Sequence, residues 1–453
     1  MGADDGGITQ DDRVSEIEGP VDRVVVVGAG IAGLTAASRL RQHGIDCVVL
    51  EARDRIGGRL HTVELAGVPV DLGGSWIHHP IGNPLTAFCD EHGVVRDKGN
   101  PIPSLSAYDR VEGRRLDSAE TATYSVAESE AFWDSVMLLN ERLGPGATGR
   151  EAIEAYVAER GLTGAVARRV RQELLAEVEA DAADTADNSS LYWLSTDEDF
   201  EGDLFGDLPR RGYRSVVSAV ADGLDIRCNT EAVAIEVDAG GIRVACGDGS
   251  AEAGSHVIVS VPLGVLKKGR PRFDPPLPAP AQGAIEALGF GRYEKIALRF
   301  ESAFWREDGI SHLIVFPAAE HEPTMWVFDL DDFGAGPVLC AHLFHSITHY
   351  ALDHPSAQAV EWLKAVLTDV FGRPVPEPVA TVVTAWANDP FAGGAYSHCL
   401  PGDDLSMFDL LAEPVHGRVL LAGEHTQSGR PGYADGAYVS GLRAAERLGA
   451  QKR

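Results

Sequence analysis

Positive charge is scarce in this sequence. Its 453 residues carry 39 Lys and Arg against 68 Asp and Glu, so the formal net charge is −29. Only six of the basic residues are lysines. A surface this acidic repels nucleic-acid phosphate and anionic lipid, so the composition argues against nucleic acid and membranes as partners. The same field attracts cations.

Long apolar runs, a leader peptide and paired cysteines are also missing. The apolar stretches 24–27 and 257–266 are shorter than the roughly 18 residues that a membrane span needs. Residues 1–20 are polar and acidic, unlike a signal peptide, and we expect them to form a flexible tail. The six cysteines show no CxxC pair and no metal-ligand spacing. We therefore predict a cytoplasmic protein with reduced thiols and no metal site.

The composition is that of a globular protein, with 44% apolar and 24% charged residues. The length suggests two to four domains, or two interleaved ones. Residues 22–27 and 46–51 are β-branched runs typical of buried parallel strands. The segment 34–43 between them has helical spacing and is closed by Gly44. This βαβ unit predicts an α/β fold with a Rossmann-like domain.

The rest of the chain alternates between helical and strand patterns. The Pro-rich segment 271–280 is typical of a connector, and we expect the chain to cross between domains there. An antiparallel hairpin is predicted over 226–246, with its turn at 240–241. Further helices are expected over 118–143, 150–179, 357–370 and 434–448, and further strands over 256–261, 296–300, 313–316, 338–344 and 419–422.

A glycine fingerprint follows the first strand. Gly28 permits a tight turn, Gly30 lets backbone N–H groups approach a pyrophosphate, and Gly33 lets the helix pack closely on the strand. The helix N-terminus adds partial positive charge facing that pyrophosphate. Glu51 ends the next strand, where it can accept hydrogen bonds from a ribose diol. This pattern predicts a dinucleotide site but does not separate NAD from FAD.

The residues after Glu51 favour FAD. Gly58 is followed by Arg59, which can neutralise phosphate charge, and a second glycine pair follows at Gly73 and Gly74. These glycines bring backbone close to something large and flat, which a simple nicotinamide site does not require. The predicted cofactor contacts in this part of the chain are Glu51, Ala52, Arg53, Gly58, Arg59, Gly73, Gly74, Ser75 and Trp76.

With these motifs the sequence resembles the flavin amine oxidase family, which includes monoamine and polyamine oxidases. The resemblance implies an FAD-binding domain in three segments, interleaved with an α+β substrate-binding domain. It predicts an FAD-binding domain at 21–85, 201–275 and 386–453, and a substrate domain at 86–200 and 276–385. The matching motifs lie at 24–33, 50–59, 71–78, 260–267, 293–300, 304–305, 386–397 and 422–445.

The resemblance also implies catalytic residues. Lys295 matches the family lysine that hydrogen-bonds flavin N5 through a water, and its role would be to assist the reaction of reduced flavin with O₂. We expect partial burial to lower its pKa. Tyr396 and Tyr433 match the aromatic pair that faces the flavin and receives the amine. His78 matches a histidine of animal spermine and acetylpolyamine oxidases; it either contacts an amine or is an ordinary loop histidine beside His79.

Further cofactor contacts come from the resemblance. Trp386 would pack beside the flavin ring, Ala232 would contact adenine through its main chain, and Ala434 would point its backbone at N1 and C2=O. Gly423 and Glu424 would meet the ribityl–phosphate region. Ala395 occupies the position where monoamine oxidases carry the cysteine that bonds to the flavin. We therefore expect FAD to be bound non-covalently.

The predicted activity is the oxidation of an amine, with O₂ as acceptor, to an aldehyde, a smaller amine and H₂O₂. A polyamine or diamine such as spermidine, spermine or putrescine is the expected substrate, and the negative field of the protein would attract it weakly.

An aromatic monoamine oxidase, an L-amino acid oxidase and a non-oxidase flavoprotein remain alternatives. Residues 75–78 offer no Arg for an amino-acid carboxylate. A histone demethylase is disfavoured because no extra N-terminal domain or coiled-coil insertion is recognised. A monomer or homodimer is expected. Residues 197–199 either line a cationic channel or form a solvated acidic loop.

Overall fold

The computed structural model describes residues 16–98, 105–196, 200–202 and 205–451. The chain forms two compact units. Unit 1 comprises Met1–Gly58, Val217–Leu288 and Leu405–Arg453, and unit 2 comprises Arg59–Val216 and Gly289–Asp404. Most of the expected tail 1–20 and all of the acidic segment 197–199 lie outside the described residues. The assignment of the predicted domain bounds to FAD and substrate stays a prediction.

Unit 1 contains a parallel sheet that begins with the predicted βαβ unit. Five strands run in the order β22-β13-β1-β2-β9, and every pairing in this sheet is parallel. The helix α1 (Ile31–Gln42) joins β1 to β2 and is followed by Gly44 at φ +67°, as predicted. The strands are β1 (Arg23–Val27), β2 (Asp46–Leu50), β9 (Ile226–Arg227), β13 (His256–Val259) and β22 (Val419–Leu421).

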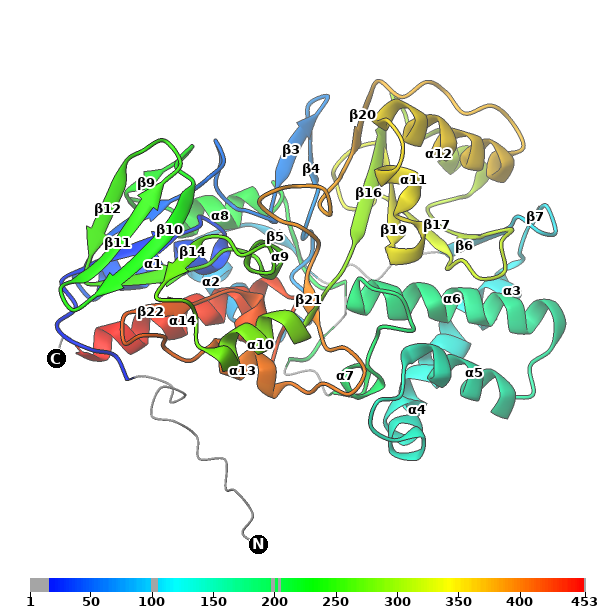
Figure 1. The fold of residues 1–453 in the computed structure, drawn as a ribbon. Helices are drawn as coiled ribbons and strands as arrows, with labels where there is room; N and C mark the ends of the chain where they lie inside the picture. The colour runs from blue at the N-terminus through cyan, green and yellow to red at the C-terminus, as the bar shows by residue number, and fades with distance from the viewer. Residues whose placement is uncertain (1–15, 99–104, 197–199, 203–204, 452–453) are drawn as a thin grey trace, which may run out of the picture. The chain divides into compact units, whose positions relative to one another are not determined.

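The helix α1 packs against the last helix of the chain, α14 (Ala434–Gln451) (Figure 1). A Cβ at Gly441 would lie 2.2 Å from the carbonyl oxygen of Ala32, so only a glycine allows this approach. The remaining unit 1 helices are α9 (Leu263–Leu266), α10 (Ala279–Ala287) and α13 (Ser406–Leu411), with a 3₁₀ turn η5 (Glu424–Thr426).

A second sheet of unit 1 corrects two predictions. The hairpin with its turn at 240–241 is present, but Ile226 is outside it, because β9 pairs in parallel with β2 instead. The Pro-rich segment 271–280 is no crossing between units, since it lies inside unit 1 and contains β14, which pairs with β10. The strands, in the order β12-β11-β10-β14, are β10 (Ala232–Asp238), β11 (Gly241–Cys246), β12 (Ala251–Gly254) and β14 (Arg272–Asp274).

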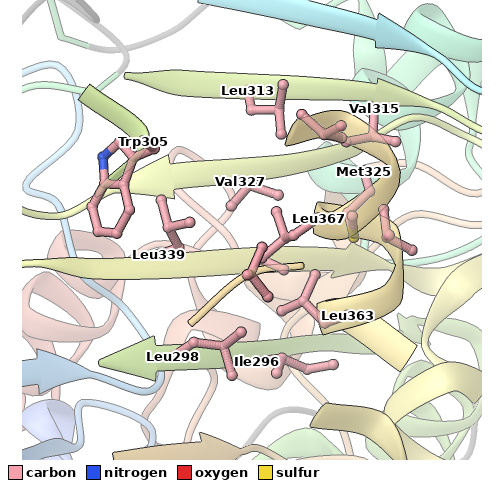
Figure 2. Packing of buried hydrophobic residues seen from close by; sticks show 14 of the residues in the cluster. Ile296, Leu298, Trp305, Leu313, Val315, Met325, Val327, Leu339, Leu363 and Leu367 are labelled. Atoms are coloured by element: carbon pink, nitrogen blue, oxygen red, sulfur yellow. The ribbon is translucent and has the colours of Figure 1, made fainter. Parts of the chain in front are cut away.

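Unit 2 is built on a mixed sheet of seven strands, in the order β20-β16-β19-β18-β17-β6-β7. One face packs against α12 (Ser356–Phe371), where Ile296 and Leu298 lie with Leu363 and Leu367 in a buried apolar cluster (Figure 2). The strands are β6 (Leu105–Asp109), β7 (Arg114–Arg115), β16 (Tyr293–Arg299), β17 (His312–Phe316), β18 (Met325–Asp329), β19 (Val338–Phe344) and β20 (Ala380–Val383). Because side chains alternate along β16, Tyr293 and Lys295 point to the opposite face.

The helices of unit 2 differ from prediction at one point. The expected helix 150–179 is two helices, because Gly161 and Gly164 both adopt positive φ. The helical segment 118–143 is present, with a π-helical turn at Thr123–Ala127. The helices are α2 (Pro84–Glu91), α3 (Ser118–Ala122), α4 (Glu128–Leu143), α5 (Gly149–Glu159), α6 (Gly164–Ala182), α7 (Leu191–Leu194) and α11 (His349–Leu352).

Short elements complete the described fold. Three small antiparallel pairs belong to unit 2, namely β3 (Thr62–Leu65) with β4 (Val68–Asp71), β5 (Arg96–Asp97) with β8 (Leu208–Pro209), and β15 (Gly289–Phe290) with β21 (Ser397–His398). The helix α8 spans Arg214–Val220, and 3₁₀ turns lie at Phe304–Asp308 and His345–Ile347. Across the described ranges we find no helix with the length and hydropathy of a membrane span.

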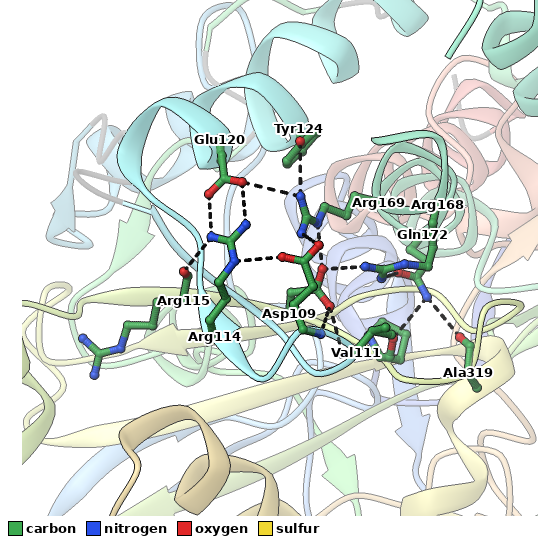
Figure 3. A network of polar contacts seen from close by, with 12 residues as sticks. Asp109, Val111, Arg114, Arg115, Glu120, Tyr124, Arg168, Arg169, Gln172 and Ala319 are labelled. Atoms are coloured by element: carbon green, nitrogen blue, oxygen red, sulfur yellow. Dashed lines mark hydrogen bonds and ion pairs between the residues drawn. The ribbon is translucent and has the colours of Figure 1, made fainter. Parts of the chain in front are cut away.

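A buried ion-pair network fastens the β6–β7 hairpin to α6 (Figure 3). The fully buried Asp109 carboxylate accepts hydrogen bonds from Arg168 and Arg169, at 2.5 and 2.7 Å. Burial alone would raise the pKa of Asp109, but the two guanidinium groups hold it below its usual value. Removing one partner of a buried ion pair leaves a charge uncompensated and destabilises the fold. We therefore interpret this network as a structural feature that holds the hairpin to α6.

Candidate flavin and amine site

The predicted dinucleotide turn forms at the start of α1. Gly28 has φ +100°, and a Cβ there would lie 2.7 Å from the hydroxyl of Ser260. A Cβ on Gly33 would lie 2.1 Å from the carbonyl oxygen of Gly28, closer than any real contact allows. The close packing of helix on strand therefore explains why both positions are glycine.

Gly30 requires a different explanation. A Cβ there would meet no protein atom within 4 Å among the described residues. Gly30 is the N-cap of α1, no side chain caps it, and no acidic residue lies in the first turn. The first N–H groups of a helix have no partner within the helix and carry partial positive charge. The open space and these donors together fit a phosphate-bearing cofactor.

Glu51 is held rigidly beside this turn. Its buried carboxylate accepts hydrogen bonds from the backbone N–H of Ala29 at 2.7 Å and of Arg53 at 2.9 Å. A carboxylate has about four acceptor sites, so capacity remains for a ribose hydroxyl. The flanking backbone is fixed by the N–H groups of Thr230 and Asn229, which donate to the carbonyls of Glu51 and Arg53. Ala232 follows at a bulge that opens β10.

Glycines of the segment after Glu51 make close contacts with the rest of the chain. In unit 1, a Cβ on Gly58 would sit 3.4 Å from the Cα of Gly30. In unit 2, a Cβ on Gly73 would sit 1.7 Å from the carbonyl oxygen of Arg59, and one on Gly74 would sit 2.7 Å from Leu60. Packing within the protein thus accounts for Gly73 and Gly74. The Arg59 guanidinium donates to the carbonyl of Ala395 at 2.6 Å.

The start of α14 is tied to the loop before it. The buried Glu424 carboxylate accepts the N–H of Gly432 at 3.0 Å, and the N–H of Gly423 donates to the hydroxyl of Ser440 at 2.8 Å. Tyr433 immediately precedes Ala434, the first residue of α14. The backbone at the helix start is therefore fixed, which suits its predicted contact with an anionic flavin edge.

Lys295 is a buried lysine in the interior of the unit 2 sheet. Its Nζ donates to the carbonyl of Gly73 at 2.7 Å, the hydroxyl of Ser75 at 2.8 Å and the carbonyl of Asp71 at 3.3 Å. Burial lowers its pKa, as expected, while the nearby Asp71 acts in the opposite direction. Burial also raises the pKa of the Asp71 carboxyl to about 6. This lysine is not on an edge strand, since β16 lies between β20 and β19.

Trp386 packs against the glycine-rich segment that contains Trp76. The Trp386 indole donates to the carbonyl of Leu72 at 3.0 Å, and its ring lies 3.5 Å from the position of a Cβ on Gly73. The Nζ of Lys295 lies 5.9 Å from the centre of the Trp76 ring. The indole N–H of Trp76 is buried without a hydrogen-bond partner among the described residues, so it is a donor that a flavin carbonyl could accept from.

Two buried residues next to Lys295, in sequence or across the sheet, are not among the predicted site residues. Glu294 is fully buried, and its carboxylate accepts the backbone N–H groups of Trp386 and Ala387, both at 3.0 Å. His342 pairs with Lys295 across β16 and β19, and burial lowers its pKa well below the usual value. The only sequence signal for Glu294 is its position next to Lys295. No sequence signal points to His342.

The face of the unit 2 sheet that carries Lys295 also carries a row of aromatic rings, which we call the aromatic wall. The hydroxyl of Tyr293 lies 2.7 Å from Nδ1 of His342. The Tyr293 ring lies 6.2 Å from that of Tyr396, and the His342 ring lies 6.0 Å from that of Trp76. These rings place apolar and uncharged groups next to Lys295. Such a wall disfavours a positively charged nitrogen near the lysine.

The remaining predicted catalytic residues are Tyr396, Tyr433 and His78. The Tyr396 hydroxyl donates to the carbonyl of Ala180 in unit 2, and Tyr433 belongs to unit 1, so their pairing stays a prediction. The His78 ring lies 6.4 Å from the Trp76 ring, and its carbonyl accepts the side-chain N–H of Asn83 at 2.9 Å. Its contact with an amine also stays a prediction.

Comparison with known proteins identifies the family. The sequence profile described as flavin containing amine oxidoreductase matches residues 31–449. Polyamine oxidase 2 of Arabidopsis thaliana is 30% identical over 442 residues, covering 93% of this chain and 87% of that protein. The chain therefore belongs to the flavin-containing amine oxidoreductases.

Two further similar proteins carry names that indicate other substrates. Lysine-specific histone demethylase 2 of Homo sapiens is 32% identical over 447 residues, which are 94% of this chain and 53% of that protein. The chain thus spans about half the length of this curated relative. A solved structure of a putrescine oxidase with a redesigned cofactor site superimposes with a TM-score of 0.74 at 22% identity, covering 94% of this chain and 98% of that one. This likeness confirms the predicted fold class, an α/β fold of the amine oxidase type.

Proposed function

We propose that the protein is an FAD-dependent oxidase of amines and that its substrate is a polyamine or diamine. The observation that carries this proposal is the buried Lys295, held by Gly73 and Ser75 beside Trp76. A buried lysine with a lowered pKa is rare unless it has a chemical role. When bound, FAD supplies the acceptor for the hydride equivalent from the carbon next to the amine nitrogen.

The chain's own residues would bind the cofactor as follows. The turn from Gly28 to Gly33 holds the pyrophosphate, and Glu51 holds a ribose. Ala232 contacts adenine through its backbone, and Glu424 meets the ribityl–phosphate region. Ala52, Arg53, Gly58, Arg59, Gly423 and Ala434 complete the proposed contacts, with Gly73, Gly74, Ser75, Trp76 and Trp386 beside the ring. Since Ala395 offers no thiol, the cofactor is bound non-covalently.

Lys295 would act on the second half of the reaction. Its three hydrogen bonds fix the position of Nζ, and its low-dielectric surroundings strengthen any interaction that it makes. We propose that Nζ, exchanging its longest contact, to the carbonyl of Asp71, would hold a water beside the bound cofactor and so assist the reaction with O₂, which would become H₂O₂. The imine product is hydrolysed to an aldehyde and a smaller amine.

The substrate nitrogen would react in its uncharged form. Tyr396 and Tyr433 each offer a ring to the amine, and His78 is a further candidate contact. The neutral wall of Tyr293 and His342 supports an uncharged nitrogen near Lys295. The net charge of −29 supports a polycationic substrate through steering. A cytoplasmic location and a monomeric or homodimeric state remain predictions from the sequence.

A methylated lysine side chain is the second candidate substrate. It is favoured by the 32% identity to a lysine-specific histone demethylase, which is similar to the 30% identity to polyamine oxidase 2. Both candidates are cationic amines oxidised next to nitrogen, so the family alone does not separate them. The absence of an Arg in residues 75–78 still argues against an L-amino acid oxidase.

A substrate panel tests the proposal. Purified protein is incubated in air with putrescine, spermidine, spermine, their acetyl forms, aromatic monoamines, L-amino acids and a dimethyl-lysine histone peptide, and H₂O₂ is measured. We expect the highest kcat/KM with one of the polyamines. A preference for the peptide would transfer the assignment to the second candidate, and no H₂O₂ with any amine would reject an oxidase. Acid precipitation should release the yellow cofactor, because the bond is non-covalent.

A further inference from the structure

An arginine covers one face of the tyrosine that precedes α14. The guanidinium carbon of Arg430 lies 3.8 Å from the centre of the Tyr433 ring, within the range of a strong cation–π contact. The other cation–π contacts found among the described residues have centre distances of 5.2 to 5.9 Å. Arg430 is also deeply buried, with 3% of its surface exposed. The stack is therefore a constrained feature of unit 1.

The guanidinium itself is held in place from the first turn of α14. Its Nε donates to the carboxylate of Asp435 at 2.9 Å, and that carboxylate is also buried. A Cβ on Gly436 would lie 1.9 Å from the carbonyl oxygen of Arg430, so the loop lies tightly against the helix start. At Gly432, the Glu424 carboxylate fixes the backbone N–H next to Tyr433. Backbone, carboxylate and guanidinium thus leave the phenol ring little freedom.

We propose that Arg430 is a positioning residue that holds the Tyr433 ring in one plane and so sets the angle at which that ring meets the substrate nitrogen. This inference rests on the proposed function, because it assumes that Tyr433 contacts an amine. A planar guanidinium can stack on a ring, whereas the ammonium of a lysine cannot. Arg430 covers one face of the ring, so that face is closed to the amine.

The stack also affects which form of the amine the ring accepts. A cation on one face draws electron density from the ring, so the opposite face attracts a second cation less strongly. The Asp435 carboxylate, which accepts from Nε of the guanidinium, reduces this effect by partly neutralising the charge. The covered ring therefore favours an uncharged nitrogen over an ammonium, in agreement with the neutral wall of unit 2.

The first test observes the ring directly and does not depend on turnover. Holoenzyme is labelled with 3-fluorotyrosine, and the ¹⁹F resonance of Tyr433 is assigned by its loss in Tyr433→Phe. We expect Arg430→Lys, which keeps the charge and can still pair with Asp435, to shift this resonance and to narrow it as the ring gains freedom. Arg373→Gln is the matched control, because Arg373 lies over the Phe304 ring at 5.8 Å. An unchanged Tyr433 resonance in Arg430→Lys would overturn the proposal.

The second test is a double-mutant cycle on the rate of anaerobic flavin reduction at saturating amine. We expect Arg430→Lys to slow reduction by about threefold to thirtyfold, the range that a cation–π contact of this kind implies. In the Tyr433→Leu background the same change should have no further effect, since no ring remains to position. An equal loss in both backgrounds would overturn the proposal, because Arg430 would then act independently of the ring.

Two outcomes keep this test separate from that of the proposed function. If no amine reduces the wild-type flavin, the proposed function fails while the ¹⁹F experiment still decides whether Arg430 orders the ring. If the wild type is reduced but the cycle shows no coupling, only this inference fails. Should Arg430→Lys not fold, the double variant Arg430→Gln/Asp435→Asn, a neutral pair of similar shape, is measured against Asp435→Asn by the same criteria.

Discussion

The two units hold their candidate site residues by different means. In unit 1, the turn from Gly28 to Gly33 is one continuous segment, and its geometry follows from the strand and helix at its ends. In unit 2, Lys295 reaches Gly73 and Ser75, which are more than 200 positions away in the sequence. Local backbone constraints therefore define the cofactor turn, whereas sheet register and burial define the surroundings of the lysine.

Substitution within the turn should give the largest effect. Gly33→Ala places a Cβ 2.1 Å from the carbonyl of Gly28, so we expect unfolding free energy to fall by about 4 kcal/mol, with loss of the flavin. Gly30→Ala meets no described protein atom within 4 Å, so its fold should survive while FAD affinity falls. Denaturant unfolding and flavin titration measure both. Equal stability losses in the two variants would contradict the packing explanation.

Buried acids give unit 2 a pH dependence. Burial raises the pKa of Glu179 to about 7, from an ordinary value of 4.5. The folded form therefore keeps a proton that the unfolded form has lost, so this carboxyl reduces stability progressively between about pH 4.5 and pH 7 and by a constant amount above that. Above pH 7, this shift in pKa lowers the free energy of unfolding by about 3 kcal/mol.

Glu179→Gln tests this dependence. The backbone N–H and the hydroxyl of Ser346 donate to different oxygens of the carboxylate, at 2.8 and 2.6 Å. In the variant the amide oxygen can accept from the backbone N–H, while the amide NH₂ can donate to the hydroxyl oxygen. We expect the variant to gain stability over the wild type as pH rises from 5 to 8, measured by urea unfolding. Glu446→Gln, at an exposed position, is the control. A variant whose advantage does not grow with pH would show that Glu179 is ionised at no cost.

Lys295→Met removes the ammonium while keeping a long apolar side chain. We expect reoxidation by O₂ to slow by about tenfold or more, which corresponds to about 1.4 kcal/mol, while anaerobic reduction by the amine changes less. Stopped-flow absorbance separates the two half-reactions. Lys364→Met is the control, since Lys364 pairs with Glu361 and Glu377 away from the cluster. Equal slowing of both half-reactions would remove the role assigned to Lys295.

Trp386→Phe should give the smallest effect. It removes the hydrogen bond to the carbonyl of Leu72 and leaves that acceptor without its donor, at a cost of about 1 kcal/mol. If the indole lies beside the flavin as proposed, the flavin absorption band should also shift. Trp362→Phe, at a ring stacked on Tyr350, is the matched control and should leave the band unchanged. A band unaffected by both changes would place Trp386 in the core only.

The features that could be predicted from sequence are local ones. The strand before Gly28, the helix after it and the end of that helix at Gly44 follow from a short window of residues, and the structure confirms them. Burial of Lys295 was expected because a lysine in an apolar strand needs a reason, and it is confirmed.

The features that were missed depend on distant residues. His342 became part of the cluster because β19 pairs with β16 in one register, which no local pattern encodes. Ile226 was assigned to the wrong hairpin because its β-branched neighbourhood fits a parallel strand equally well. The break near Gly161 was overlooked because glycine within a helical pattern is tolerated in many helices. Sequence motifs predict membership of the family. The choice of substrate follows neither from these motifs nor from the described structure.

Anaerobic titration of the purified holoenzyme with spermidine is the decisive experiment. We expect a yellow protein whose flavin absorbance bleaches on addition of the amine and returns on admission of air, with the return slowed in Lys295→Met. A flavin that stays oxidised under spermidine, spermine and putrescine would contradict the polyamine assignment, and a colourless protein that takes up no FAD would contradict the whole account.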